Sequence, residues 1–225
     1  MQMAVPIHLF DIYRSANIGI FLKANDSVCL VPRGVSSTKE AKIENLLRSK
    51  PIQISVGGSR LLGPLVAMNN SGIVLSRLAE DSEVSKLRDE TGLEVLRLNS
   101  RFTSVGNLIS ANDRGAVISD VFGEESSKAI GETLKVPVRR MKIASFVQVG
   151  AMISATNRGA VIHPAASEEE ISRIRGVLGF EPEPATVNGG VPFVSSGFVG
   201  NTSAILLGAQ TRGAELVIVS KAFST

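Results

Sequence analysis

The chain has 225 residues, of which 44% are apolar, so it can build one large domain or two small ones around a full core. Its 24 basic and 21 acidic residues leave a net charge of only +3 that is spread along the sequence, which alone gives no argument for nucleic-acid binding. A single cysteine, Cys29, excludes an internal disulfide, and the sequence has neither a secretory leader nor an apolar run of membrane-spanning length. We therefore expect a cytoplasmic protein with no membrane segment.

One hairpin pattern recurs along the chain: a glycine, a short apolar strand, a polar turn and a second apolar strand. The copies read NIGIFLKANDSVCLVP from Asn17, LLGPLVAMNNSGIVLS from Leu61, SVGNLISANDRGAVIS from Ser104, QVGAMISATNRGAVIH from Gln148 and FVGNTSAILLGAQTRGAELVIVS from Phe198. Their leading glycines, spaced by 44, 43, 44 and 50 residues, are Gly19, Gly63, Gly106, Gly150 and Gly200. A period this regular indicates five copies of one unit.

A second glycine lies in the polar turn of copies two to four, at Gly72, Gly115 and Gly159. It follows a polar pair, a pattern typical of a tight turn that needs a positive φ. In copy five the corresponding pair is Arg212-Gly213, which predicts an extended first strand or approach loop and a final strand over AELVIVS.

Helical segments are predicted between the hairpins, over 36–49, 82–92, 123–134 and 167–179. The first and last carry capping boxes, Ser37 with Glu40 and Ser167 with Glu170, and the last stops at Gly179. Short third strands follow at 51–56, 93–99 and 135–141, whereas 187–197 offers at most a helical stub. Such a unit cannot bury its sheet alone, and both chain ends are apolar, so we expect a ring in which the first and last copies pair.

These five hairpins in order, with the NDRGAVIS and TNRGAVIHP turns and the closing GAELVIVSKAF, resemble the translation initiation factor 6 family of archaea and eukaryotes. The likeness covers residues 1–225 and implies a single α+β pentein domain, five ββαβ repeats around a pseudo-fivefold axis. It further implies a monomeric factor that is not an enzyme and needs no cofactor. Such factors bind the large ribosomal subunit, prevent its association with the small subunit and assist its maturation. The expected contact is mainly ribosomal protein L14 near the sarcin-ricin loop, with rRNA as a further possibility.

The family docks through the edge of the ring where each hairpin begins. The matching residues of this chain, which the resemblance makes ribosome-binding candidates, are Arg60, Pro64, Asn107, Ala151, Met152 and Asn201. An asparagine suits such a contact because it can both donate and accept hydrogen bonds, although Asn107 can equally cap a turn. The prediction is that Asn107→Arg or Asn201→Arg weakens ribosome binding and leaves the fold intact.

Other candidates are weaker. Three arginines assigned to the turns either touch rRNA phosphate or keep the turns soluble: Arg114, Arg158 and Arg212. A pentein-fold amidine hydrolase, resembling arginine deiminases, is the alternative function, but it needs a late nucleophilic cysteine, and Cys29 lies early in an apolar strand. A ring that chaperones another assembly remains a third possibility. His8, His163 and Cys29 show no metal-ligand spacing, so no metal site is expected.

Overall fold

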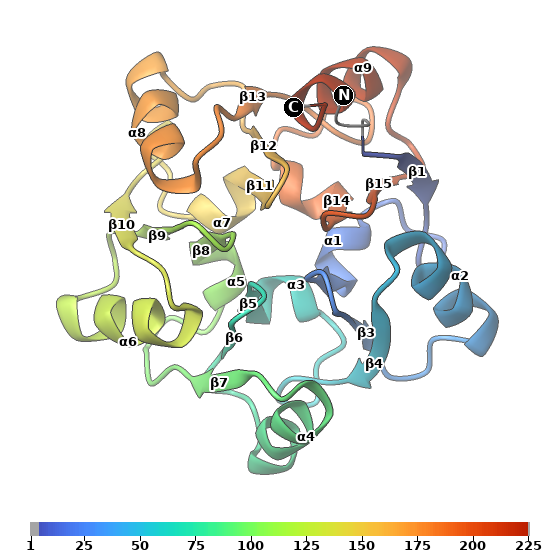
Figure 1. Cartoon of the computed structure of the whole chain (residues 1–225), viewed down its shortest axis with the longest axis vertical. Helices are drawn as coiled ribbons and strands as arrows, with labels where there is room; N and C mark the ends of the chain where they lie inside the picture. Colours follow the sequence, from blue (N-terminus) through green and yellow to red (C-terminus); the bar gives the residue numbers. More distant parts are fainter. Residues whose placement is uncertain (1–4, 225) are drawn as a thin grey trace.

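The computed structural model describes residues 5–224, in which five three-stranded sheets surround a central axis like blades (Figure 1). The strands of blades 1 to 4 are, in turn, β2 (Lys23–Ala24), β3 (Val28–Pro32) and β4 (Lys50–Ile54); β5 (Val66–Met68), β6 (Gly72–Leu75) and β7 (Glu94–Arg97); β8 (Ile109–Ala111), β9 (Ala116–Ser119) and β10 (Val138–Met141); β11 (Ile153–Thr156), β12 (Gly159–Ile162) and β13 (Glu183–Pro184). Within each blade the first two strands are antiparallel and the third runs parallel to the second. The predicted α+β pentein architecture is confirmed.

Blade 5 joins the two ends of the chain. Its hairpin is formed by β14 (Phe198–Gly200) and β15 (Ile205–Gly208), and its third strand is β1 (Ile7–Phe10) from the start of the sequence. β1 runs parallel to β15 with Ile7 opposite Ile205, so the first strand of the described chain lies beside the last one (Figure 1). The first and last copies therefore close the ring, as the apolar chain ends predicted.

Helices on the outer side of the blades cover the sheets (Figure 1). They are α2 (Ser37–Leu47), α4 (Asp81–Thr91), α6 (Glu124–Leu134), α8 (Glu168–Leu178) and α9 (Gly213–Ala222). The Ser167–Glu170 capping box of α8 and its left-handed end at Gly179 are confirmed. The start of α2 differs by one residue, because Ser36 is the N-cap and its hydroxyl accepts a hydrogen bond from the Lys39 amide.

The end of copy five was predicted wrongly. The run AELVIVS forms most of helix α9 instead of a strand, and the hairpin turn lies at Asn201–Ala204, so Arg212 is the N-cap of α9 and not a turn residue. Its β-branched residues favour a strand, but tertiary context overrides that preference. Buried Val219 and Ala222 pack into the core of blade 5, and the Glu215 carboxylate accepts a hydrogen bond of 2.8 Å from the Arg212 amide at the helix start.

Gly200 is the last residue of β14, but the other four leading glycines lie in one-turn helices around the axis. These are α1 (Ile18–Phe21), α3 (Leu62–Leu65), α5 (Val105–Leu108) and α7 (Val149–Met152), and the equivalent helix of copy five is the 3₁₀ helix η1 (Val194–Gly197). Neighbouring helices pack backbone to backbone, since a Cβ on Gly63 or Gly106 would lie 1.9 Å from the carbonyl oxygen of the preceding leading glycine. In copy five the equivalent residue is Ser195, not Gly200, which changes the last spacing from 50 to 45 residues.

The glycines of the hairpin turns also serve close packing. None of Gly72, Gly115 and Gly159 has a positive φ, contrary to the prediction. A Cβ at these positions would lie 2.1, 2.3 and 2.0 Å from a carbonyl oxygen of the outer helix of the next blade. The hydrophobic core fills the same seams: one cluster joins Leu30 of blade 1 to Ile73 of blade 2. Glycine here permits neighbouring blades to approach each other.

Candidate functional site

The central channel is closed at one end by the five hairpin turns, which we call the plug. Its residues are Asn25–Asp26, Asn69–Asn70, Asn112–Asp113, Thr156–Asn157 and Asn201–Thr202. Each inner asparagine donates its side-chain amide to the backbone carbonyl of the next turn: Asn25 to Asn69 at 2.9 Å, Asn69 to Asn112 at 3.1 Å, Asn112 to Thr156 at 3.2 Å and Asn201 to Asn25 at 3.0 Å. Only the link from Thr156 is absent among the described residues, because threonine has no amide to donate.

A second layer of side chains completes the plug. The Asp26 carboxylate accepts hydrogen bonds from the Asn70 amide, the Asn157 amide and both the backbone and hydroxyl of Thr202. Burial alone would raise the pKa of Asp26, but these hydrogen bonds outweigh it and hold the pKa below its ordinary value. The plug is therefore a bonded lid made of the chain itself.

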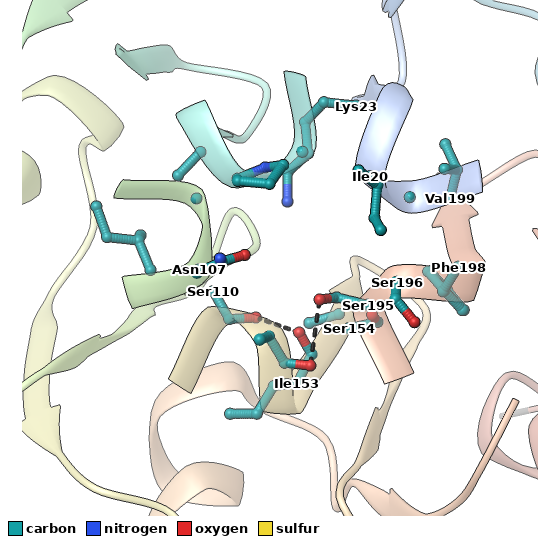
Figure 2. A pocket seen from close by; sticks show the side chains of 18 of the residues that line it. Ile20, Lys23, Asn107, Ser110, Ile153, Ser154, Ser195, Ser196, Phe198 and Val199 are labelled. Carbon is teal, nitrogen blue, oxygen red and sulfur yellow. Dashed lines mark hydrogen bonds between the residues drawn. The ribbon is translucent and has the colours of Figure 1, made fainter. Parts of the chain in front are cut away.

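The other end of the channel is open. It is framed by the third residue of each one-turn helix, a set that we call the mouth ring: Ile20, Pro64, Asn107, Ala151 and Ser196. All five are half-buried and border a cavity of about 500 Å³ that extends down the axis (Figure 2). The side-chain amide of Asn107 forms no hydrogen bond with residues 5–224, so it is available to a partner at the opening.

Carboxylates hold the loops around the mouth in place. Glu83 accepts hydrogen bonds from the backbone amides of Gly57 at 2.7 Å and Gly58 at 3.4 Å, and Glu215 accepts from Gly189 and Gly190. Both glycine pairs have positive φ, a conformation that glycine adopts at little cost. Burial works to raise the pKa of Glu83, yet its hydrogen bonds lower the pKa overall. The face that carries the mouth ring, with the loops before the one-turn helices, is called the mouth face below.

Four of the six predicted site residues lie on the mouth face, and two do not. Pro64, Asn107 and Ala151 belong to the mouth ring, and Arg60 is exposed in the loop just before α3. Met152 is 0% exposed, inside the core of blade 4, where a partner cannot reach it. Asn201 is 2% exposed and lies in the plug at the opposite end of the channel, so its alignment with Asn107 was wrong by the register shift of copy five.

Sequence reasoning missed most of the charge on the mouth face. Four exposed arginines in the loops of blades 1 and 2 form no ion pair with a described residue: Arg14, Arg33, Arg60 and Arg77. The loops are adjacent, since the Tyr13 hydroxyl lies 3.4 Å from the Arg33 carbonyl oxygen and a Cβ on Gly34 would be 3.9 Å from the Arg60 guanidinium. Arg33 and Arg77 share one repeated position, directly after the hairpins of copies one and two, whereas copies three and four have Asp120 and Pro164 there. The arginine is therefore not a constant part of the repeat.

Exposed apolar side chains cover the other side of the mouth face. Phe146 and Phe193 are 42% and 37% exposed, with ring centroids 5.8 Å apart, and both border the cavity. Leu61, 44% exposed, lies next to Arg60 on the arginine side, and it precedes α3 at the position that Phe193 has before η1. The plug-side arginine Arg114 is instead engaged within the chain, donating to the Gly179 carbonyl and stacking over Phe180 at 4.4 Å.

The residues considered for catalysis or metal binding are scattered. Cys29 is fully buried in β3, where burial raises the pKa of its thiol to about 12. Burial also lowers the pKa of His163, whose Nδ1 accepts a hydrogen bond from the Ala165 amide. Within residues 5–224 no three His, Cys, Asp or Glu side chains gather where they could hold a metal ion, and no helix has the length and apolar character to cross a membrane.

Comparison with known proteins gives one consistent relationship. The sequence matches the eIF-6 family over residues 7–222. It is 41% identical over 220 residues to translation initiation factor 6 of Cenarchaeum symbiosum, covering 98% of this chain and 100% of that protein. The factor of Nitrosopumilus maritimus is 41% identical over 214 residues, covering 95% and 97%, and that of Pyrococcus horikoshii is 33% identical over 221 residues, covering 96% and 97%. A solved structure, C. jejuni agmatine deiminase, aligns with a TM-score of 0.37 at 12% identity, covering 56% of this chain and 50% of that one.

Proposed function

The chain belongs to the eIF-6 family, and from this premise we propose that it is a translation initiation factor that binds the large ribosomal subunit through its mouth face. Bound there, the ring would occupy the surface that the small subunit needs and would prevent the two subunits from joining, and it would assist large-subunit maturation. The role requires no turnover and no cofactor. A single copy in the cytoplasm would suffice.

The observation that carries this proposal is the contrast between the two ends of the channel. The plug uses its polar side chains in hydrogen bonds within the chain, as Asp26 and Asn201 do. The mouth face instead offers an Asn107 amide and arginines that have no hydrogen-bonded or ionic side-chain partner among the described residues, together with exposed aromatic rings. Buried carboxylates hold the loops that carry Arg60 and Phe193. A rigid surface with aromatic and arginine side chains is typical of protein interfaces, because little ordering is needed on binding.

The mouth face also suggests how two kinds of partner could be bound together. The arginines of blades 1 and 2 suit rRNA phosphates, because one guanidinium group can donate two hydrogen bonds to the oxygens of one phosphate. The apolar side, with Phe146 and Phe193, suits a protein surface, for which the family resemblance suggests ribosomal protein L14. We place the sarcin-ricin loop on the arginine side and the ribosomal protein on the aromatic side.

Sedimentation of purified ribosomal subunits with the protein tests the proposal. Co-sedimentation with the large subunit, and fewer joined ribosomes, support it. The salt dependence of binding measures the RNA share, and Arg60→Gln should reduce the slope of log affinity against log salt by about 1. Lys128→Gln, a surface change on the outer helix α6, is the matched control and should leave the slope unchanged.

A further inference from the structure

The cavity behind the mouth ring is large enough for a small molecule and has a single way in. Its volume of about 500 Å³ lies within the ordinary range of ligand pockets. The innermost strands of all five blades form its wall, the plug closes one end and the mouth ring leaves the other open. A ligand must therefore enter through the mouth face.

One cation projects into this cavity. The first strands of the blades place five equivalent residues around the axis, which are Lys23, Ala67, Ser110, Ser154 and Val199. Only blade 1 supplies a charge there, and Figure 2 shows the Lys23 side chain extending its nitrogen into the opening. Lys23 forms neither an ion pair nor a side-chain hydrogen bond with any residue in the range 5–224.

Nothing in the wall balances this charge. The residues that line the cavity include no aspartate or glutamate, and the nearest carboxylate along the chain, Asp26, is already occupied by donors in the plug. Lys23 is half-buried, so its cation is only partly withdrawn from water, and it has no partner there to offset that cost. Apolar neighbours such as Ile20 and Phe198 strengthen its effect on a ligand. The electrostatic potential in the cavity therefore favours an anionic ligand and disfavours a cationic one such as a guanidinium or an ammonium group.

Hydrogen-bond donors in the wall complete an anion site. The Ser154 hydroxyl and the Asn107 amide both border the cavity and have no hydrogen-bond partner among the described residues. Ser110 and Ser195 differ, because their hydroxyls donate to the carbonyl oxygens of Ile153 and Ala151 (Figure 2). We propose that the cavity binds a small free anion bearing phosphate or carboxylate groups, with Lys23 as counter-ion and Ser154 and Asn107 as donors.

Titration of the free protein tests the site without ribosomes, so its outcome is independent of the proposed ribosome binding. The probes are inorganic phosphate and citrate, added at constant ionic strength with chloride as the reference salt, and the signal is the ¹³C-labelled ε-carbon of Lys23. We expect a saturable shift with at least one of the two probes, and the stronger one identifies the preferred group. Ser154→Ala should weaken binding, and Lys23→Met should weaken it about tenfold or more, as expected for a lost charge-assisted hydrogen bond.

A stability measurement provides the second readout. A ligand that binds only the folded state raises the unfolding temperature, so the preferred probe should stabilise the wild type and the Lys128→Met control but not Lys23→Met. The proposal is wrong if the Lys23 signal does not shift with either probe, or if phosphate and citrate stabilise Lys23→Met as much as the wild type. An equal shift with chloride would also contradict it, because it would indicate screening without a site.

Discussion

The side-chain amide of Asn201 donates a hydrogen bond of 2.8 Å to the carbonyl oxygen of Leu47, 154 residues away in the sequence. The same amide donates to Asn25, and its oxygen accepts from the backbone of Ser203 and Ala204. One buried side chain thus joins blade 5 to blade 1 and shapes its own turn. Asn201 therefore stabilises the closed ring by linking its last blade to its first.

Asn201→Ala should therefore destabilise the fold, by about 2–4 kcal/mol, because it leaves several buried backbone groups without partners. Urea unfolding measures the change. Ser203→Ala in the same turn is the control, since the Ser203 side chain makes no hydrogen bond to a described residue, and it should unfold near the wild-type midpoint. An unchanged midpoint for Asn201→Ala would contradict the assignment of Asn201 to the scaffold.

At the seam between blades 4 and 5 a hydrogen bond between turns can be added instead of removed. Thr156 stands where the four other turns have an asparagine that bonds to the next turn. Among the described residues its hydroxyl accepts only from the Arg158 amide. Thr156→Asn should keep that bond and add donors toward blade 5, raising the free energy of unfolding by about 1 kcal/mol. Asn112→Thr is the reverse change in blade 3 and should lower it. If Thr156→Asn were destabilising, the turns would not be interchangeable.

Acid should lower the stability of the folded ring, because three carboxylates that hold its turns and loops become protonated. The pKa values of Asp26, Glu83 and Glu215 are all lowered in the folded state, because hydrogen bonds outweigh burial. Groups of this kind stabilise the fold above their unfolded pKa, and the stabilisation is lost as the pH falls through the folded value. Unfolding midpoints should therefore drop below pH 4.5, the ordinary value for glutamate. Glu83→Gln should flatten this dependence, whereas a wild-type midpoint that stays constant into acid would contradict it.

The contribution of Lys23 to stability should depend on pH in the opposite direction to that of the three carboxylates. Burial lowers its pKa from 10.5 to about 8, so the folded state disfavours the charged form and the full cost is present below pH 8. Lys23→Met should stabilise the protein at pH 7 by up to about 3 kcal/mol, and the gain should vanish as the pH rises toward the unfolded value. Equilibrium unfolding of both proteins across that range is the measurement. A Lys23→Met variant less stable than the wild type at pH 7 would show that the cation is already paired.

The period of the glycines predicted five copies of one unit, and the apolar chain ends predicted the closure of the ring. The same glycines gave no hint of why they are needed: Gly63 and Gly106 permit helix contact, and Gly72 permits a helix end to approach, whereas positive φ occurs at other residues such as Gly57. These roles depend on how closely the neighbouring backbone approaches each glycine, which the spacing of glycines in the sequence does not reveal.

The candidate site was predicted only where the repeat is regular. Asn107 and Pro64 lie in copies whose register was correct, and both reach the mouth ring. Asn201 was misplaced because copy five lacks a leading glycine, and Met152 because the side chains of a one-turn helix alternate between channel and core. The arginines and aromatic rings of the mouth face stand in loops whose residue types change from copy to copy, so the constant residues of the repeat do not reveal them.

The central claim is that the mouth face binds the large ribosomal subunit, and comparing Asn107→Arg with Ser27→Arg in co-sedimentation tests it most directly. Asn107 lies in the mouth ring, whereas Ser27 is exposed on a hairpin turn at the plug end, so both variants gain the same side chain on opposite faces. We predict that the wild type and Ser27→Arg travel with the large subunit and reduce joining, while Asn107→Arg binds about tenfold more weakly or worse. Failure of the wild type to bind, or equal binding of Asn107→Arg, would contradict the account.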